Sequence, residues 1–256
     1  MLNQIDIQDI IAIAKEAGEA IMEIYNKDFE VEYKKDRSPI TLADKRANKI
    51  IESGLNKLSV DLPILSEEGG ITPYEDRKHW KYFWLVDPLD GTKEFVKKNG
   101  EFTVNIALIH IDLPVLGVVY APALDVCYWA KQDGGAFKNG QKLPLETAEQ
   151  REKYSVVVSR SHMSKDTQKF IDAIDTDKEK ELISMGSSLK ICLVAEGKAN
   201  IYPRLGPTME WDTGAAHSIV NEAKKVLKCY ENNRYFKHLY NKKNLLNRWF
   251  VVFDDK

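Results

Sequence analysis

Apolar residues recur at helical spacing through the first part of the chain. Between about residues 7 and 25 they fall at every third or fourth position, as Ile7, Ile10, Ile11, Ala14, Ala17, Ile21 and Ile24. This spacing predicts an amphipathic helix, because residues three and four apart share one helix face. A second helix is expected from about Leu42 to Leu58. Thr41 can cap it, and Asp44 follows three residues later, close to the capping-box pattern.

The pattern changes to strands between about residues 82 and 136. Four stretches rich in β-branched and aromatic residues are expected as strands: Tyr82–Val86, Thr103–His110, Val115–Tyr120 and Val126–Ala130. Turn signals separate them, including Asp112-Leu113-Pro114 and Asp133-Gly134-Gly135. Successive strands joined by short turns favour an antiparallel meander.

From about residue 153 the chain alternates between strand and helix patterns. Strands are expected at 156–159, 182–185, 199–202 and 249–253, and helices at 165–174, 188–196 and 213–222. The fold class is therefore mixed α/β. We expect an antiparallel-rich α+β lobe over residues 1–153 and an α/β lobe over residues 154–256, forming one catalytic unit.

The bulk numbers describe an ordinary globular protein and exclude several functional classes. The chain has 256 residues, 43% of them apolar and 30% charged, and its 37 basic and 39 acidic residues leave a net charge of −2. This balance provides no positive field for holding nucleic acid or an anionic membrane. A phosphorylated ligand must therefore be met by local cations or by metal ions.

Neither the cysteines nor the hydropathy pattern indicates export or membrane insertion. Cys127, Cys192 and Cys229 are far apart and include no CxxC pair, so we expect reduced, packed thiols. Met1–Ile10 has no basic region followed by an apolar run, and no apolar stretch approaches the ~18 residues that span a bilayer. We expect a cytoplasmic protein, either free or resting on the cytoplasmic face of the inner membrane.

The stretch from Trp84 to Phe95 carries the clearest chemical signal. An apolar strand ends in Asp87-Pro88-Leu89-Asp90 and then breaks at Gly91-Thr92. Two carboxylates three residues apart at a strand end can converge on hard cations, which prefer oxygen ligands. Gly91-Thr92 then opens a short helix whose backbone N–H groups would face an anion. The competing interpretation is an ordinary turn with two solvated aspartates.

Further carboxylates lie at the ends of other predicted elements. Glu67 and Glu68 follow the short strand Pro63–Ser66, and Asp212 begins the helix predicted at residue 213. Each has a plain structural alternative: Asp212 as a helix N-cap, Asp44 as a capping-box residue and Glu68 as a solvated neighbour. Taken together, these acidic elements fit a multi-metal phosphoryl-transfer site.

The combination of these segments resembles a known family. Glu67-Glu68, Asp87-Pro88-Leu89-Asp90-Gly91-Thr92 and Trp211-Asp212 look like the acidic loop and the two signature motifs of the inositol monophosphatase superfamily, in matching order and spacing. The resemblance runs from the first helix to nearly the last strand. It implies a layered α-β-α-β-α sandwich.

Finer stretches are similar to one branch, the bacterial CysQ-type 3'(2'),5'-bisphosphate nucleotidases. These stretches are residues 90–95, 99–105, 159–162, 186–190 and 202–208. The resemblance implies removal of the 3'-phosphate of adenosine 3',5'-bisphosphate, a by-product of sulfate activation, to leave AMP. Agreement fades after about Ala223, so contacts from residues 224–247 stay open.

The resemblance also implies Mg²⁺ as the cofactor, with two to three ions per site. Glu67 and Asp87 would hold one ion together with the backbone carbonyl of Leu89. Asp87, Asp90 and Asp212 would hold a second. Asp87 then bridges, because two adjacent cations need a shared anion and one carboxylate has two oxygens.

Four residues receive catalytic roles by the same resemblance: Asp44, Thr92, Glu67 and Asp87. Asp44 and Thr92 would position the attacking water, while the metal lowers the pKa of that water. Asp212 would stabilise the departing oxygen. No covalent enzyme intermediate is expected.

Substrate binding is assigned to groups at the predicted cleft. They are Gly91, Thr92, Ser159, Arg160, His162, Ser187, Lys190, Arg204 and Asp212. Arg204 precedes Gly206-Pro207 in an irregular loop, where a guanidinium could clamp the 5'-phosphate bidentately. For Lys190 the alternative is a solvated helix face, and for His162 a surface histidine.

Other functions share part of this pattern. One keeps the fold and takes inositol monophosphate or another sugar phosphate as substrate. Another is a regulator that holds metal and phosphate without turnover, which the presence of Thr92 and Asp44 beside a full ligand set argues against. The expected partner is a small nucleotide, with no nucleic acid and no integral membrane segment, and the protein is expected as a monomer or homodimer.

Overall fold

The computed structural model describes residues 1–27, 31–33, 39–147, 151–160 and 163–254. Two helices form its first layer. These are α1 (Ile7–Tyr25), which is preceded by the single turn η1 (Leu2–Gln4), and α2 (Leu42–Leu55). Their apolar faces bury Ile10, Ala17 and Ile51 against one side of a sheet. The helix predicted for residues 7–25 is confirmed at both ends.

That sheet has seven strands in the order β3-β4-β5-β6-β7-β8-β9. The strands are β3 (Ile64–Ser66), β4 (Tyr82–Asp90), β5 (Thr103–His110), β6 (Leu113–Ala121), β7 (Val126–Lys131), β8 (Gly135–Lys138) and β9 (Gln141–Lys142). Every neighbouring pair is antiparallel except β3 and β4, which run parallel. The predicted meander is confirmed.

Two further helices, α6 (Leu189–Glu196) and α7 (Gly214–Glu222), form a central layer between the sheets. Nearly every residue of α6 is buried, as expected for a helix covered on both sides. The backbone of α7 lies very close to β6: a Cβ on Gly117 would stand 2.2 Å from the Ala215 carbonyl oxygen. Only glycine fits at that contact.

The second sheet has the order β11-β10-β12-β15-β13-β14. Its strands are β10 (Tyr154–Ser159), β11 (Lys180–Met185), β12 (Ile201–Arg204), β13 (Val226–Glu231), β14 (Arg234–Lys237) and β15 (Phe250–Phe253). Helix α5 (Lys165–Asp172) packs on its outer face through Phe170 and Ile171. Helices and sheets therefore alternate in five layers, which confirms the predicted α-β-α-β-α sandwich.

Shorter elements connect these layers. They are β1 (Val31–Tyr33), β2 (Pro39–Thr41), α3 (Tyr74–Arg77), α4 (Thr92–Val96) and η3 (Glu210–Asp212). No helix in the described part of the chain has the length and apolar character needed to cross a membrane. The first sheet ends at Lys142 and the second begins at Tyr154, and the lobe division near residue 153 stays a prediction.

Several predicted boundaries are wrong. The second helix ends at Leu55 rather than Leu58, just after Gly54, because glycine weakens a helix end. The turn placed at residues 112–114 lies at Ile111-Asp112, and Pro114 stands inside β6 at a β-bulge, where no ladder N–H is required. Strand β12 begins two residues after the predicted position. The hairpin β13–β14 was not predicted at all.

Candidate active site

Strand β4 delivers the aspartates and then changes direction. It pairs regularly with β5 as far as Asp87 and Asn105, and its register shifts between Asp87 and Asp90. Such a bulge turns side chains away from the regular alternation of a strand. Gly91 follows with a φ of 96°, a left-handed conformation that suits glycine, and α4 begins at Thr92. The short helix predicted after Gly91 is confirmed.

Three carboxylates from separate elements meet beside this bulge. Glu67 follows β3, Asp87 belongs to β4 and Asp212 ends η3, and their oxygens lie within 4.8 Å of one another. Glu67 and Asp87 are neighbours because β3 and β4 run parallel and end at the same edge of the sheet. Sequence reasoning selected all three residues, and the structure brings them together.

Burial and mutual repulsion make this cluster electrostatically unfavourable by itself. Asp87 is only 1% exposed, so solvated aspartates do not describe this turn. Burial raises the pKa of Asp87 well above its usual value, and the charges of Glu67, Asp90, Asp212 and Asp44 raise it further. The pKa of Asp212 is raised for the same reasons, chiefly burial and then Asp90 and Glu67. Hard divalent cations relieve such repulsion and take oxygen ligands, so this cluster can bind a metal ion.

The remaining predicted acidic groups surround the cluster. Asp44, on α2, is 3% exposed and close enough for its charge to act on Asp87. The alternative interpretation of Asp44 as a capping-box residue depends on the side chain of Thr41, which is outside the side chains that the structure describes. Glu68 is half-buried with one shielded oxygen, so it is more than a solvated neighbour of Glu67.

Two hydrogen bonds connect the residues at the end of β4 with the first residue of α4. The Leu89 N–H donates to Asp87 Oδ1 at 3.1 Å, and the Thr92 hydroxyl donates to the Leu89 carbonyl at 3.4 Å. Asp87, Leu89 and Thr92 are thereby linked through two hydrogen bonds. The alternative interpretation of Asp212 as a helix N-cap is wrong, because Asp212 ends η3 and Thr213 is the N-cap of α7.

Sequence reasoning missed two residues near Asp90: Ser188, which binds its carboxylate, and Asn105, which binds Ser188. The Ser188 hydroxyl lies 2.8 Å from Asp90 Oδ2 and 2.7 Å from the Asp212 carbonyl, and it accepts a hydrogen bond from Asn105 Nδ2 at 2.9 Å. The Ser188 hydroxyl has one proton, so it donates to only one of these two acceptors at a time. Because it lies within hydrogen-bond distance of both, Ser188 connects Asp90 with Asp212. A polar residue on β5 opposite Asp87 was the available signal for Asn105.

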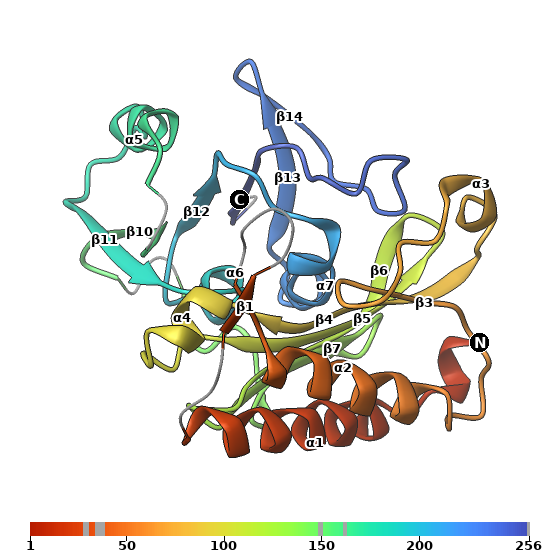
Figure 1. The fold of residues 1–256 in the computed structure, drawn as a ribbon. Helices are drawn as coiled ribbons and strands as arrows, with labels where there is room; N and C mark the ends of the chain where they lie inside the picture. The colour runs from red at the N-terminus through yellow and green to blue at the C-terminus, as the bar shows by residue number, and fades with distance from the viewer. Residues whose placement is uncertain (28–30, 34–38, 148–150, 161–162, 255–256) are drawn as a thin grey trace.

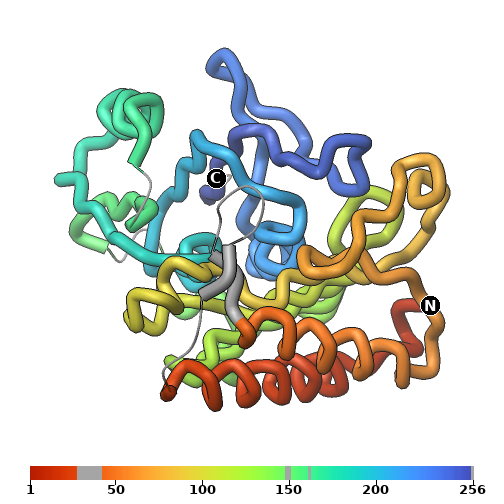
Figure 2. Tube along the Cα trace, viewed as in Figure 1, coloured from red at the N-terminus to blue at the C-terminus, as the bar shows by residue number. Residues whose placement is uncertain are grey.

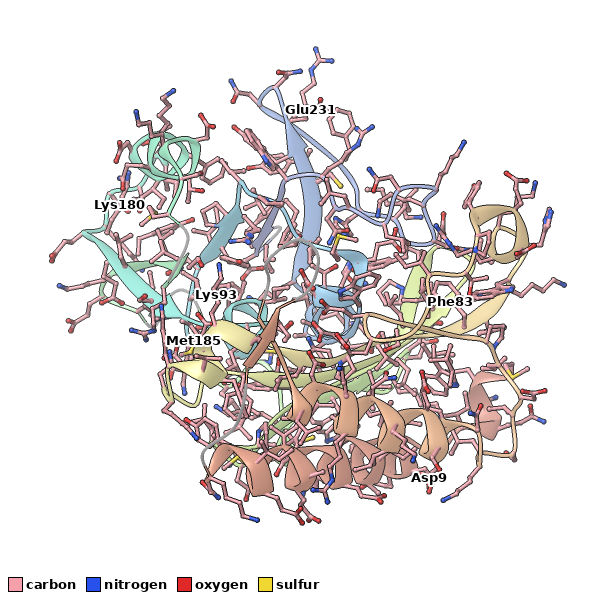
Figure 3. The ribbon with its side chains drawn as sticks, in the orientation of Figure 1. Asp9, Phe83, Lys93, Lys180, Met185 and Glu231 are labelled. Atoms are coloured by element: carbon pink, nitrogen blue, oxygen red, sulfur yellow. The ribbon has the colours of Figure 1, made fainter. Side chains whose placement is uncertain are left out.

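The carboxylates open into a cleft of about 800 Å³. Predicted residues lining it are Glu67, Asp87, Leu89, Asp90, Gly91, Thr92, Ser159, Ser187, Lys190, Arg204 and Asp212. Lys93 of α4, labelled in Figure 3, lines it too, as do Glu94 and Tyr202, which were not predicted. Asp44 is not among the lining residues.

Besides Lys93, two cations stand in the cleft with the acidic cluster, Lys190 and Arg204. Lys190 Nζ donates to the Ser187 carbonyl at 2.6 Å, and burial lowers the pKa of Lys190 to about 8, although nearby Asp90 opposes the change. A solvated helix face is therefore the wrong description of Lys190. Arg204 donates to the Pro207 carbonyl at 2.9 Å. Its Nε is buried, and no described residue offers it an acceptor.

One predicted substrate residue, Arg160, is not brought to this cleft. The guanidinium of Arg160 binds both carboxylate oxygens of Glu101, at 2.8 and 2.6 Å, and Arg160 is not among the residues lining the cleft. This bidentate ion pair joins the end of β10 to the segment before β5. His162 lies outside the described residues.

Comparison with known proteins gives this geometry a family. Residues 2–247 match the model of the inositol monophosphatase family. The chain belongs to this family. The 3'(2'),5'-bisphosphate nucleotidase CysQ of Salmonella typhimurium is 48% identical over 217 residues, which cover 83% of this chain and 86% of the relative.

Two further family members extend the similarity over the whole chain. The protein of the same name from Haemophilus influenzae is 34% identical over 262 residues, covering 100% of this chain and 95% of that protein. The crystal structure of CysQ from Bacteroides thetaiotaomicron superposes with a TM-score of 0.87 at 42% identity, covering 97% of both chains. The expected family and its CysQ branch are confirmed.

Proposed function

We propose that this protein is a Mg²⁺-dependent 3'(2'),5'-bisphosphate nucleotidase. It hydrolyses the 3'-phosphate of adenosine 3',5'-bisphosphate and releases AMP and phosphate. One observation carries the proposal: a single cleft is lined both by the carboxylates of Glu67, Asp87 and Asp212 and by the cations of Lys190 and Arg204. The names of the CysQ relatives support the same substrate class.

We propose two to three Mg²⁺ ions at the acidic cluster, which has the carboxylates to hold a metal ion. Glu67, Asp87 and the Leu89 carbonyl would hold one, and Asp87, Asp90 and Asp212 a second, because all five residues line the cleft. Bound Mg²⁺ supplies a water of lowered pKa and neutralises charge on the transferring phosphoryl group.

Two residues of this chain are assigned to accept the proton of the attacking water. The Thr92 hydroxyl and the buried carboxylate of Asp44 would position the attacking water; the water would give a proton to the Thr92 oxygen while the hydroxyl proton of Thr92 moves to Asp44. Asp212 lies beside the departing 3'-oxygen. The phosphate then leaves directly, without a covalent enzyme intermediate.

The cations determine which ester binds. Lys190, Arg204, Ser187 and Ser159 line the cleft and hold the ribose and the 5'-phosphate, which is bound but not cleaved. In a chain of net charge −2 this dianion needs such local cations. We leave Arg160 out of the substrate site because Glu101 occupies its guanidinium.

We propose a cytoplasmic location, either free or at the cytoplasmic face of the inner membrane, and a monomer or homodimer. The described cysteines support the first part: Cys127, Cys192 and Cys229 are free and buried, as expected in a reducing compartment.

Product analysis tests the proposal. The protein is incubated with adenosine 3',5'-bisphosphate and Mg²⁺, with an EDTA sample as control, and the nucleotides are separated by chromatography. We expect AMP and phosphate in equal amounts and neither in EDTA. Release of adenosine 3'-monophosphate instead would reverse the proposed orientation of the substrate. A protein that binds the nucleotide without turnover would be the regulator considered above.

A further inference from the structure

The turn that carries Asp212 has little stability of its own. Element η3 is a three-residue 3₁₀ turn. It is held internally by the Asp212 N–H to the Met209 carbonyl at 3.2 Å, by the Met209 N–H to Asp212 Oδ2 at 2.8 Å, and by the Thr213 N–H and hydroxyl to the Glu210 carbonyl, both at 3.1 Å. Short 3₁₀ turns have poor hydrogen-bond geometry. In addition, Asp212 faces the negative charges of Asp90 and Glu67. Other contacts must therefore keep Asp212 in place before a metal binds.

A segment from far along the chain supplies backbone contacts to this turn. The Glu210 N–H donates to the Leu245 carbonyl at 3.0 Å, and the Asn247 N–H donates to the Thr208 carbonyl at 2.8 Å. Between these bonds, Met209 and Leu246 form an antiparallel bridge. The turn thus has a short β-like partner.

The side chain of Asn247 reaches both sides of Asp212. Its Nδ2 lies 2.7 Å from the Met209 carbonyl and 3.2 Å from the hydroxyls of Thr208 and Thr213. Asn247 is 5% exposed, so water cannot replace these contacts freely. One amide therefore fixes the residues before and after the ligand aspartate.

The carboxylate of Glu210 anchors the same segment. It is fully buried and accepts from the Asn241 N–H at 2.7 Å and the Lys242 N–H at 3.0 Å, and it pairs with Lys242 Nζ at 2.5 Å. Burial raises the pKa of Glu210, and Lys242 opposes that change. Charge-assisted bonds of this kind fix a turn more firmly than neutral ones.

Arg77 of α3 connects the segment to the first sheet. Its guanidinium donates to Asn241 Oδ1 and to the Lys242 carbonyl, both at 2.7 Å, and to the Lys243 carbonyl at 3.2 Å. Figure 2 shows the corresponding dark blue chain beside α3. The contacts therefore run from α3 through residues 241–243 to Glu210, two residues from Asp212.

From these contacts we propose that residues 241–247, the C-terminal clamp, hold Asp212 in position for metal binding. The inference rests on the proposed function, in which Asp212 is a metal ligand. Asn247 and Lys242 are positioning residues and touch no substrate. Partners that orient metal ligands are typically worth about 10–100-fold in metal affinity.

Metal binding without substrate tests the clamp. Mn²⁺ and Mg²⁺ are titrated by calorimetry into the parent protein and into Asn247→Ala, Lys242→Met and Lys243→Met. We expect binding about 10–100-fold weaker in the first two variants. Lys243→Met is the matched control, because its side chain is exposed and only its carbonyl contacts Arg77; we expect parental affinity.

Each other outcome has a defined meaning. Folded Asn247→Ala and Lys242→Met proteins that bind Mn²⁺ as the parent does would overturn the clamp and leave the proposed function intact. A parent that binds no divalent ion would instead contradict the proposed function. If both variants fail to fold, hydrogen exchange of the metal-free parent decides: slow exchange of the Glu210 and Asn247 amides supports the clamp, and fast exchange contradicts it.

Discussion

Two regions serve the same acidic cluster in different ways. The end of β4 and the start of α4 place Asp87, Leu89, Asp90 and Thr92 within six consecutive residues. The C-terminal clamp assembles over long distances, since Asn247 contacts a carbonyl 38 residues away and Arg77 contacts Asn241 across 164 residues. Part of the acidic cluster is thus concentrated in one motif, whereas Asp212 and the groups that contact its turn come from distant parts of the chain.

Asp87→Asn should show the largest effect, because it removes the carboxylate shared between the proposed ions. We expect phosphate release to fall by at least about 100-fold while the circular dichroism spectrum stays parental. Metal titration should show the corresponding loss. A folded variant with even a tenth of parental activity would contradict the bridging role.

Thr92→Ala tests whether the segment Asp87–Thr92 also positions the attacking water. Since the hydroxyl is assigned to water positioning, kcat should fall by about 10²-fold or more with little change in KM. Steady-state kinetics with adenosine 3',5'-bisphosphate measures both constants. An increase in KM alone would make Thr92 a binding residue.

Arg204→Ala tests a residue of the second sheet, at the end of β12, that is assigned to the 5'-phosphate. Loss of a contact to the 5'-phosphate should lower kcat/KM for the bisphosphate by about 10–100-fold, since a buried group left unpaired costs about 1–3 kcal/mol. Hydrolysis of inositol 1-phosphate, which has no second phosphate, should barely change. Equal losses on both substrates would place Arg204 in the structural scaffold.

Part of the fold and of the candidate site could be predicted from the sequence, and part could not. The strands around β4 and the aspartates of the acidic cluster were predictable because each is local: apolar runs ended by carboxylates, in a spacing that also resembles a family. The hairpin β13–β14 was missed because β14 is exposed along its whole length and shows no alternation. The pairing of Arg160 with Glu101 and the contacts of Ser188 and Asn247 depend on tertiary geometry, which no local pattern encodes.

Ser188→Ala should have a smaller effect than loss of a ligand. Its hydroxyl orients Asp90 and the Asp212 carbonyl but touches no metal in the proposed site. We expect Mg²⁺ to be needed at about 10-fold higher concentration, with kcat at saturating Mg²⁺ changed far less. Ser188→Thr, which keeps a hydroxyl, should recover part of the affinity. Unchanged Mg²⁺ dependence in Ser188→Ala would contradict the orienting role.

The smallest expected effect is on thermal stability. Because the pKa values of Asp87 and Asp212 are raised in the folded state, the metal-free folded protein binds more protons than the unfolded chain above the ordinary value of 3.8. The contribution of the cluster to stability is therefore present at low pH and is lost as the pH rises through the raised values. Mg²⁺ should relieve this loss, so it should raise Tm more at pH 8 than at pH 5.

Thermal scans with EDTA or Mg²⁺ at the two pH values measure this difference. We expect about 2–4 °C for each kcal/mol that the metal contributes. Asp87→Asn should reduce the pH dependence of the Mg²⁺ effect. If Mg²⁺ raises Tm by the same amount at pH 5 and pH 8, protons and metal do not compete for the acidic cluster.

The most direct test of the proposed function is a ratio of two rate constants. With Mg²⁺ present, kcat/KM is measured for adenosine 3',5'-bisphosphate and for inositol 1-phosphate on the same enzyme preparation. The cleft that contains Lys190 and Arg204 beside the acidic cluster predicts a large preference for the bisphosphate. Faster cleavage of inositol 1-phosphate would contradict the proposed substrate and would leave the family assignment unchanged.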